Sequence, residues 1–295
     1  MQKMKKLFYF IMLSLLLTAM SGGCAGGDSG GETDDDTSVI FSGVTQVGGT
    51  SGTADTTSLT LTFSVDPATL TEDDITVTGA AKGTLTGTGI TRTLAISGIT
   101  VADGATVSVE VISPAGFVMS GSPRTAVVCR LLTIGMDYLG GKIAYFFVSG
   151  DTGYVPGETH GLIAAASDQA SNLEWALAQD KIGTTNTDIG TGLTNTEAIV
   201  DQNDPSHSGL TTYAAGLCAA YNGGGYTDWY LPSRYELEKI FASKDLVGGY
   251  AVNSYWSSTE CLAGDGAYGR QFWGGGIAFI LFKYDRIHVR AVRNF

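Results

Sequence analysis

Cysteine and histidine are the side chains here that could carry nucleophilic, redox or metal chemistry, and both are scarce. The chain of 295 residues has four cysteines and three histidines. His160, His207 and His288 lie far apart in the sequence, and none has a carboxylate or cysteine at the spacing of a zinc site or a catalytic pair. The sequence therefore predicts no catalytic residue, no metal, no cofactor and no enzymatic activity.

The cysteines beyond the amino terminus are too widely spaced for a redox pair. They are Cys129, Cys218 and Cys261. Cys218 falls on the apolar stripe of an expected helix, so we expect a small buried hydrophobe instead of a nucleophile. Cys218 and Cys261 could join in a disulfide in an exported protein, and the sequence leaves that pairing open.

Two polar segments suggest binding but have simpler explanations. The run Asp201-Gln202-Asn203-Asp204 supplies oxygen ligands, yet its spacing matches no known calcium loop and is more typical of a solvated turn. His160 lies in a glycine-flanked loop, where we expect its ring to bond to loop backbone.

The composition is acidic and rich in glycine. Acidic residues number 29 against 17 basic ones, which gives a formal net charge of -12. A chain with this balance is repelled by polyphosphate, which argues against a nucleic-acid-binding protein. Charged residues make up only 16%, and there are 41 glycines, a composition typical of short strands joined by turns.

The amino terminus has the features of a bacterial export signal. Lys3, Lys5 and Lys6 precede an apolar stretch over 7–17 that is too short to span a bilayer. Small residues then lead to Cys24 and resemble a lipobox, although Ser21 stands where leucine is usual. We expect residues 1–24 to be a lipoprotein signal peptide, with Cys24 lipidated; a plain secreted protein is the alternative.

A flexible acidic segment follows the signal. Residues 25–38 are rich in glycine and aspartate and have no apolar periodicity, as in a self-repelling tether. Together with lipidation at Cys24, this predicts a protein at the cell surface, anchored by lipid to the outer membrane.

Residues 39–130 alternate apolar and polar side chains. Leu59, Leu61, Phe63 and Val65 show this period of two, and Gly, Asp and Pro punctuate the chain about every ten residues. The pattern predicts an all-β sandwich, and it resembles the immunoglobulin-like repeats of bacterial surface proteins, which usually serve as spacers.

Residues 131–295 have a different pattern, with all four tryptophans and several helix signals. Apolar spacing predicts helices over Ser171–Asp180 and Ser208–Tyr221. A third helix is expected after Ser233, which forms a capping box with Glu236. The last forty residues indicate strands, so the fold class expected for this part is α+β.

Several motifs in this second part resemble a known family. They are Gly141-Lys142-Ile143-Ala144-Tyr145, Gly183-Thr184-Thr185, Gly224-Gly225-Tyr226-Thr227-Asp228-Trp229-Tyr230-Leu231-Pro232-Ser233, Tyr255-Trp256-Ser257-Ser258-Thr259-Glu260 and Val289-Arg290-Ala291-Val292-Arg293. Their order is similar to that in the family named after the carboxy-terminal domain of the Legionella collagen-like adhesin. The resemblance covers about residues 131–295 and implies a C-type lectin-like fold of the formylglycine-generating-enzyme type.

The layout of signal, sandwich and this domain resembles the variable lipoproteins of Treponema. Those proteins are targets of diversity-generating retroelements, in which reverse-transcription errors at adenines rewrite a cassette near the end of the gene. The resemblance implies a variable region at about residues 262–288, between two motifs of invariant scaffold.

The expected variable region is unusually apolar. Residues 277–282 are apolar on both faces of any strand, which is also the pattern of a core strand buried on both sides. Related domains usually carry polar, asparagine-rich sequence here, so we expect an exposed apolar patch that binds a partner. The expected ligand-binding, variable positions are Leu262, Gly264, Asp265, Tyr268, Gly269, Trp273, Gly274, Ile277, Phe279, Ile280, Leu281, Phe282, Tyr284, Asp285, Ile287 and His288.

The expected function is thus ligand binding by a changeable patch on a fixed scaffold, with an unknown protein or a neutral glycan as partner. Only Arg270, Lys283 and Arg286 supply positive charge in this stretch, so binding of sulfated glycans is expected to be weak. The main alternative is an adhesin of fixed specificity for a host glycan or protein. A surface-layer component is a third, although the sequence shows no repeats.

Overall fold

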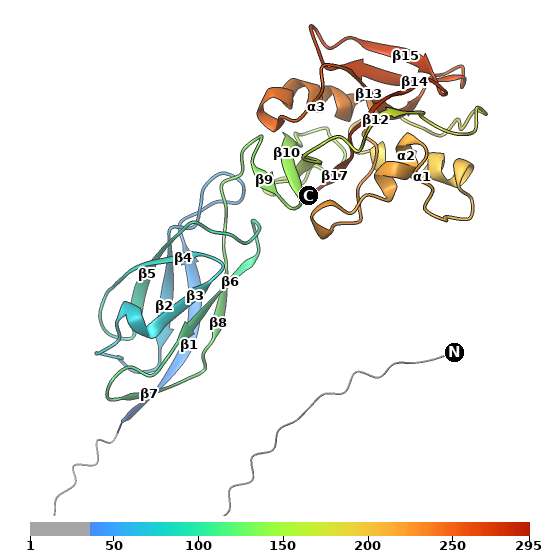
Figure 1. Ribbon diagram of the computed structural model, residues 1–295. Helices are drawn as coiled ribbons and strands as arrows, with labels where there is room; N and C mark the ends of the chain where they lie inside the picture. The colour runs from blue at the N-terminus through green and yellow to red at the C-terminus, as the bar shows by residue number, and fades with distance from the viewer. Residues whose placement is uncertain (1–35) are drawn as a thin grey trace, which may run out of the picture. The chain divides into compact units, whose positions relative to one another are not determined.

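The computed structural model describes residues 36–295 (Figure 1). The expected signal peptide, Cys24 and most of the expected tether lie outside the described residues. The first strand begins at Thr37, so the last two residues assigned to the tether belong to the folded body. Among the described residues, no helix is long and apolar enough to cross a membrane.

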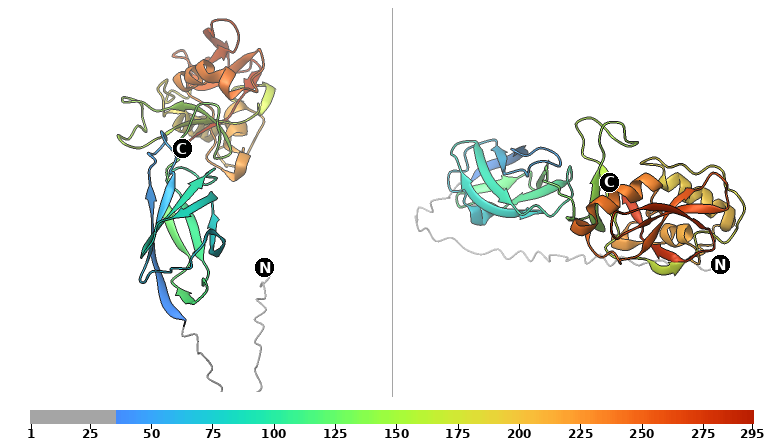
Figure 2. Two further views of the ribbon diagram at one scale, coloured as in Figure 1. Left: turned by 90° about the vertical axis from the view of Figure 1, so that its left-hand side faces the viewer. Right: turned by 90° about the horizontal axis from the view of Figure 1, so that it is seen from above.

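Residues 37–127 form two sheets with a shared core (Figures 1 and 2). The first has the order β4-β5-β2-β1-β7, with bounds β1 Thr37–Val47, β2 Ser58–Phe63, β4 Ala81–Thr86, β5 Thr91–Ser97 and β7 Phe117–Ser120. The second has the order β3-β6-β8, with bounds β3 Ile75–Thr78, β6 Thr106–Val111 and β8 Arg124–Val127. A short 3-10 turn, η1, spans Glu72–Asp74.

Side-chain alternation explains this packing. In β2, Leu59, Leu61 and Phe63 are buried while the residues between them are half-buried, and the same period recurs in β5 and β6. The buried sets of both sheets join one hydrophobic cluster, which confirms the predicted β-sandwich. β2 ends at Phe63, and Val65 beyond it is exposed.

Residues 137–294 contain two further sheets. One has the order β17-β11-β10-β9, with bounds β9 Asp137–Tyr138, β10 Gly141–Phe146, β11 Gly161–Ala164 and β17 Val292–Asn294. The other has the order β12-β16-β13-β14-β15, with bounds β12 Ala170–Leu173, β13 Ser254–Glu260, β14 Gly266–Gln271, β15 Ala278–Phe282 and β16 Ile287–Val289. Together with the sandwich, this makes the described chain a largely β protein of the α+β class.

Helices of this part are α1 Gly192–Asn203, α2 Ala214–Ala219 and α3 Arg234–Val247, with a 3-10 turn, η2, at Gly223–Gly225. The predicted capping box of α3 is confirmed. Ser233 Oγ accepts from the N–H of Glu236, and the Glu236 carboxylate accepts from the N–H of Ser233 at 2.7 Å. Leu237 and Ile240 then pack in the cluster beneath the helix.

The predicted helix over Ser171–Asp180 is wrong. Its first residues belong to β12, where Ala170 and Leu173 pair with Val289 and Ile287 of β16. The apolar spacing has another origin: Trp175 and Ala176 are fully buried while Leu177 is exposed. Long-range strand pairing therefore overrides a local helical pattern.

The second predicted helix is too long, and α1 was not expected. Within Ser208–Tyr221 only Ala214–Ala219 is helical. The segment before it is a loop bound to the Asp204 carboxylate, which accepts from the N–H groups of Ser208, Gly209 and Leu210. Helix α1 has little apolar periodicity, and half of its buried residues are the polar Asn195 and Thr196.

Candidate functional site

The candidate site is one edge of the sheet with the order β12-β16-β13-β14-β15. Strands β14 and β15 form this edge (Figure 1). β14 pairs antiparallel with β15 over five residue pairs, and in the described chain β15 has no other strand neighbour. The segment Gly274–Gly276 lies in the loop that connects these two strands. The site therefore consists of one edge strand and the loops that flank it.

The sixteen expected positions divide by exposure. The exposed ones are Leu262, Asp265, Trp273, Gly274, Ile277, Ile280, Phe282 and Tyr284; the half-buried ones are Tyr268, Phe279, Leu281, Asp285 and Ile287; the buried ones are Gly264, Gly269 and His288. Half of the set is thus open to solvent, and all of the exposed members lie on β15 or in the loops at its ends and at the end of β13.

A core strand buried on both sides would enclose residues 277–282, and this is not what the structure has. Ile277 is 64% exposed, Ile280 52% and Phe282 51%. Exposed side chains of this size on neighbouring residues form the kind of apolar surface that marks interaction sites. We call Trp273, Ile277, Ile280, Phe282 and Tyr284 the apolar edge.

Strand alternation separates the two faces of β15. Leu281 packs against the main hydrophobic cluster, whereas Ile280 and Phe282 point the other way. The Phe282 and Tyr284 rings stack at 5.2 Å between centroids with an interplanar angle of 9°. The outward face thus carries an ordered aromatic pair beside an aliphatic side chain.

The three buried positions have structural reasons to stay as they are. Gly264 has φ +84°, and a Cβ there would lie 2.6 Å from Lys181 Cβ. A Cβ on Gly269 would lie 2.9 Å from the Phe279 ring. His288 is buried with its Nδ1 2.9 Å from Asp168 Oδ2. None of the three presents a side chain to a ligand in this structure.

β13 supports the site from the inner side, and all seven of its residues are buried. Trp256 donates from its indole N–H to the Leu173 carbonyl at 2.9 Å, and Trp175 donates to the Ser257 carbonyl at 2.7 Å. Buried, satisfied hydrogen bonds of this kind fix side-chain geometry. The Trp256 side chain is fully buried.

A buried ion pair lies under the apolar edge. Lys283 Nζ is 2.7 Å from Glu260 Oε1, and the two side chains are 0% and 2% exposed. Lys283 also donates to the Asp180 carbonyl, and its ammonium lies 5.2 Å from the centre of the Trp175 ring. The Glu260 carboxylate accepts from the N–H groups of the 182–183 loop segment.

The turn between β14 and β15 is held against α3. Arg270 donates to the Gly276 carbonyl at 2.5 Å and to Glu238 Oε2 at 2.6 Å. Arg270 is itself buried, as is Lys283. Of the three cations expected on the patch, only Arg286 is therefore exposed, and it pairs with Glu174.

Sequence reasoning missed Asp168, which organises the buried end of the site. Its carboxylate accepts from the Tyr255 hydroxyl at 2.7 Å, lies beside His288 and accepts from Arg290 Nε at 2.7 Å. Burial, followed by the bond to Asp168, raises the pKa of Tyr255 above its usual range. No local signal in the sequence links Asp168 to partners that lie 87 to 122 positions away.

The residues considered for chemistry are dispersed. Cys129, Cys218 and Cys261 are free, so Cys218 and Cys261 do not form the disulfide that the sequence left open. Burial raises the pKa of the Cys218 thiol above its usual range, which disfavours the thiolate. Among residues 36–295, no group of three His, Cys, Asp or Glu side chains is arranged to hold a metal.

His160, His207 and Asp204 have structural partners. His160 Nδ1 lies 3.1 Å from the backbone oxygen of Phe295, and its Nε2 lies 2.7 Å from Glu158. His207 pairs with Asp201 at 3.0 Å. The Asp204 carboxylate accepts from the backbone and hydroxyl groups of residues 206–210, so its oxygens are already used within the turn.

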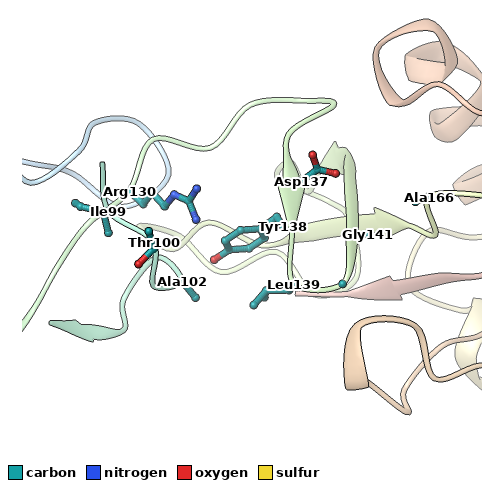
Figure 3. Close-up of a pocket in the computed structure, with 10 residues that line it drawn as sticks. Ile99, Thr100, Ala102, Arg130, Asp137, Tyr138, Leu139, Gly141 and Ala166 are labelled. Atoms are coloured by element: carbon teal, nitrogen blue, oxygen red, sulfur yellow. The ribbon is translucent and has the colours of Figure 1, made fainter. Parts of the chain in front are cut away.

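One cavity lies beside the site, and a second is lined by other residues. One, of about 440 Å³, lies against the apolar edge and is lined by Asp265, Gly266, Ile280, Leu281, Phe282 and Asp285. The other, of about 560 Å³, is lined in part by Asp137, Tyr138 and Gly141 of the β9–β10 hairpin (Figure 3). None of the sixteen expected positions lines this second cavity.

No family model matches the chain, and no curated protein matches it.

Proposed function

We propose that this protein is a surface-displayed lipoprotein that binds a partner through the apolar edge, and that a retroelement rewrites the residues of this edge. The partner is an unidentified protein or a neutral glycan, and the aromatic content of the edge favours a protein. The scaffold is of the C-type lectin-like kind, carried by an immunoglobulin-like sandwich and anchored through Cys24. Within this proposal, neither a cofactor nor a catalytic residue is required.

The exposure of Ile277, Ile280 and Phe282 is the observation that carries this proposal. Large apolar side chains that stay more than half exposed gain little from folding, so three of them within six residues call for a role in binding. Rigid support favours the same role. A site whose backbone is held by buried bonds loses little entropy when it binds, and β13 supplies that support.

Diversification requires that surface residues change while the scaffold stays folded. Variants with serine at Ile280 and at Phe282 should keep an unfolding free energy within about 0.5 kcal/mol of the wild type, because both side chains point outward. Leu281→Ser is the matched control on the same strand. It should cost about 2 kcal/mol or more because Leu281 packs against the core. Equal losses in all three variants would support a core strand and contradict the proposal.

The gene offers a direct test of the retroelement. We expect a reverse-transcriptase gene nearby and a near-copy of the segment for residues 262–288 that differs at adenines. Deep sequencing of a clonal culture should find substitutions at the exposed positions and none in the segment that encodes β13. A uniform sequence with no near-copy would leave an adhesin of fixed specificity.

A further inference from the structure

The free edge of β15 offers backbone hydrogen-bonding groups as well as apolar side chains. The N–H of Gln271 donates to the Ile277 carbonyl at 3.1 Å, which makes these two residues a hydrogen-bonded pair. Antiparallel ladders alternate, so Tyr268–Ile280 and Arg270–Ala278 are non-hydrogen-bonded pairs. The N–H and C=O groups of Ala278 and Ile280 therefore point away from β14, toward the open edge.

This open edge has a defined end. The N–H of Phe282 donates to Asp285 Oδ2, and the Phe282 carbonyl accepts from the N–H of Asp285, both at 2.9 Å. The turn thus uses the edge groups of Phe282 and leaves those of Ala278 and Ile280 for a partner. Proteins usually protect an exposed apolar edge strand with charge, proline or a bulge, yet β15 has none of these between Ala278 and Phe282.

The charge beside the edge indicates what kind of segment fits. Asp265 and Asp285 both line the cavity of about 440 Å³ next to Ile280 and Phe282. Within residues 36–295, no cation lies at ion-pair distance from either carboxylate. These two carboxylates therefore favour a positively charged partner. The formal net charge of -12 attracts such a partner over longer distances as well.

We infer that β15 binds an extended, basic segment of a partner protein as an added antiparallel or parallel strand. Ala278 and Ile280 supply backbone hydrogen bonds, alternate apolar side chains of the segment pack on Ile280 and Phe282, and a lysine or arginine enters the cavity between Asp265 and Asp285. This inference rests on the proposed function and specifies how that site recognises its partner. A second copy of this chain fits less well, because two chains that each have a formal net charge of -12 repel one another.

Substitution at Ile280 separates backbone from side-chain recognition. Proline at this position removes an N–H that β14 does not use, so Ile280→Pro should keep the fold while it blocks strand addition. Ile280→Thr is the matched control, since it keeps the N–H and a β-branched side chain. The thermal midpoints of both variants serve as the check on folding.

The probe is a random dodecamer peptide library displayed on phage and selected against the purified protein. Enriched peptides should alternate apolar residues and carry lysine or arginine. For the resynthesised peptide, Ile280→Pro should weaken binding at least tenfold, Ile280→Thr less than threefold, and Asp265→Asn should reduce both affinity and its salt dependence. Light scattering should find a monomer.

Other outcomes overturn the inference in distinguishable ways. If Phe282→Ser weakens the peptide while Ile280→Pro does not, the apolar edge binds through side chains alone, and the proposed function survives without strand addition. If neither variant affects any enriched peptide, the apolar edge is not the binding site and the proposed function fails as well. A dimer that Ile280→Pro dissociates would identify a second copy as the occupant.

Discussion

Lys283 and Glu260 form a fully buried ion pair, with 2.7 Å between Nζ and Oε1, directly beneath a surface strand whose outward neighbours are exposed. Glu260 is the last residue of β13, and Lys283 directly follows β15. The pair thus fastens the end of the candidate binding strand to the scaffold. Lys283 is therefore a structural residue within the stretch that we propose to vary.

Replacement of Lys283 should lower the unfolding free energy substantially. Lys283→Met leaves the Glu260 carboxylate buried with backbone N–H donors as its only partners, and loss of one member of a buried pair costs about 3–5 kcal/mol. Urea denaturation would measure the change in unfolding free energy. Tyr284→Ser, at the exposed neighbouring position, is the control and should stay within about 0.5 kcal/mol.

A loss below about 1 kcal/mol for Lys283→Met would mean that the loop N–H groups alone satisfy Glu260. In that case Lys283 would have no structural reason to stay constant, and the proposed variable surface would include it.

Asp204 should contribute to stability because its carboxylate holds the loop of residues 206–210. Its carboxylate accepts hydrogen bonds from Ser206, Ser208, Gly209 and Leu210, and the bond from the N–H of Ser208 is the main cause that lowers its pKa below the usual range. Asp204→Asn replaces one acceptor oxygen by a donor, so we expect a lower thermal midpoint. Asp201→Asn, at a solvent-exposed carboxylate, is the matched control.

The pH dependence of the Asp204 contribution has a definite sign. Because the folded pKa is below that of the unfolded chain, the contribution is present above the ordinary aspartate pKa and is lost as pH falls through the folded value. The gap in thermal midpoint between wild type and Asp204→Asn should therefore narrow in acid. A gap that is constant down to the acid limit would argue against an ionised Asp204 in the fold.

Local sequence signals were sufficient for part of this structure. The period of two predicted the sandwich strands, and the Ser233–Glu236 capping box located the start of α3. The pattern and the capping box each involve residues close together in the chain. They can therefore be recognised without knowledge of the rest of the fold.

Other features depend on partners far away in sequence. The pattern around Trp175 predicts a helix, because nothing local reveals the pairing of β12 with β16. Arg270 and Lys283 were expected on the surface, yet Glu238 and Glu260 allow them to be buried. Within β15 the apolar run could not distinguish a core strand from an edge strand, since that depends on whether a further strand lies beside it.

Glu236 provides the last prediction, because its burial opposes its charge. The carboxyl group caps α3 and accepts from the N–H of Gly190 at 2.8 Å and of Ser233 at 2.7 Å. Burial is nevertheless the larger effect and raises the pKa of Glu236 from 4.5 to about 7. A carboxyl group whose pKa rises on folding stabilises the protein most below its unfolded pKa, and this contribution is lost as pH increases.

The unfolding free energy of the wild type should therefore lose up to about 3 kcal/mol from this group between pH 4.5 and pH 7. Glu236→Gln cannot ionise, so its profile should be flatter over this window, whatever its absolute stability. Glu197→Gln changes an exposed carboxylate of α1 and should preserve the wild-type slope. Parallel profiles for wild type and Glu236→Gln would show that the cap's N–H donors, and not burial, set the ionisation of Glu236.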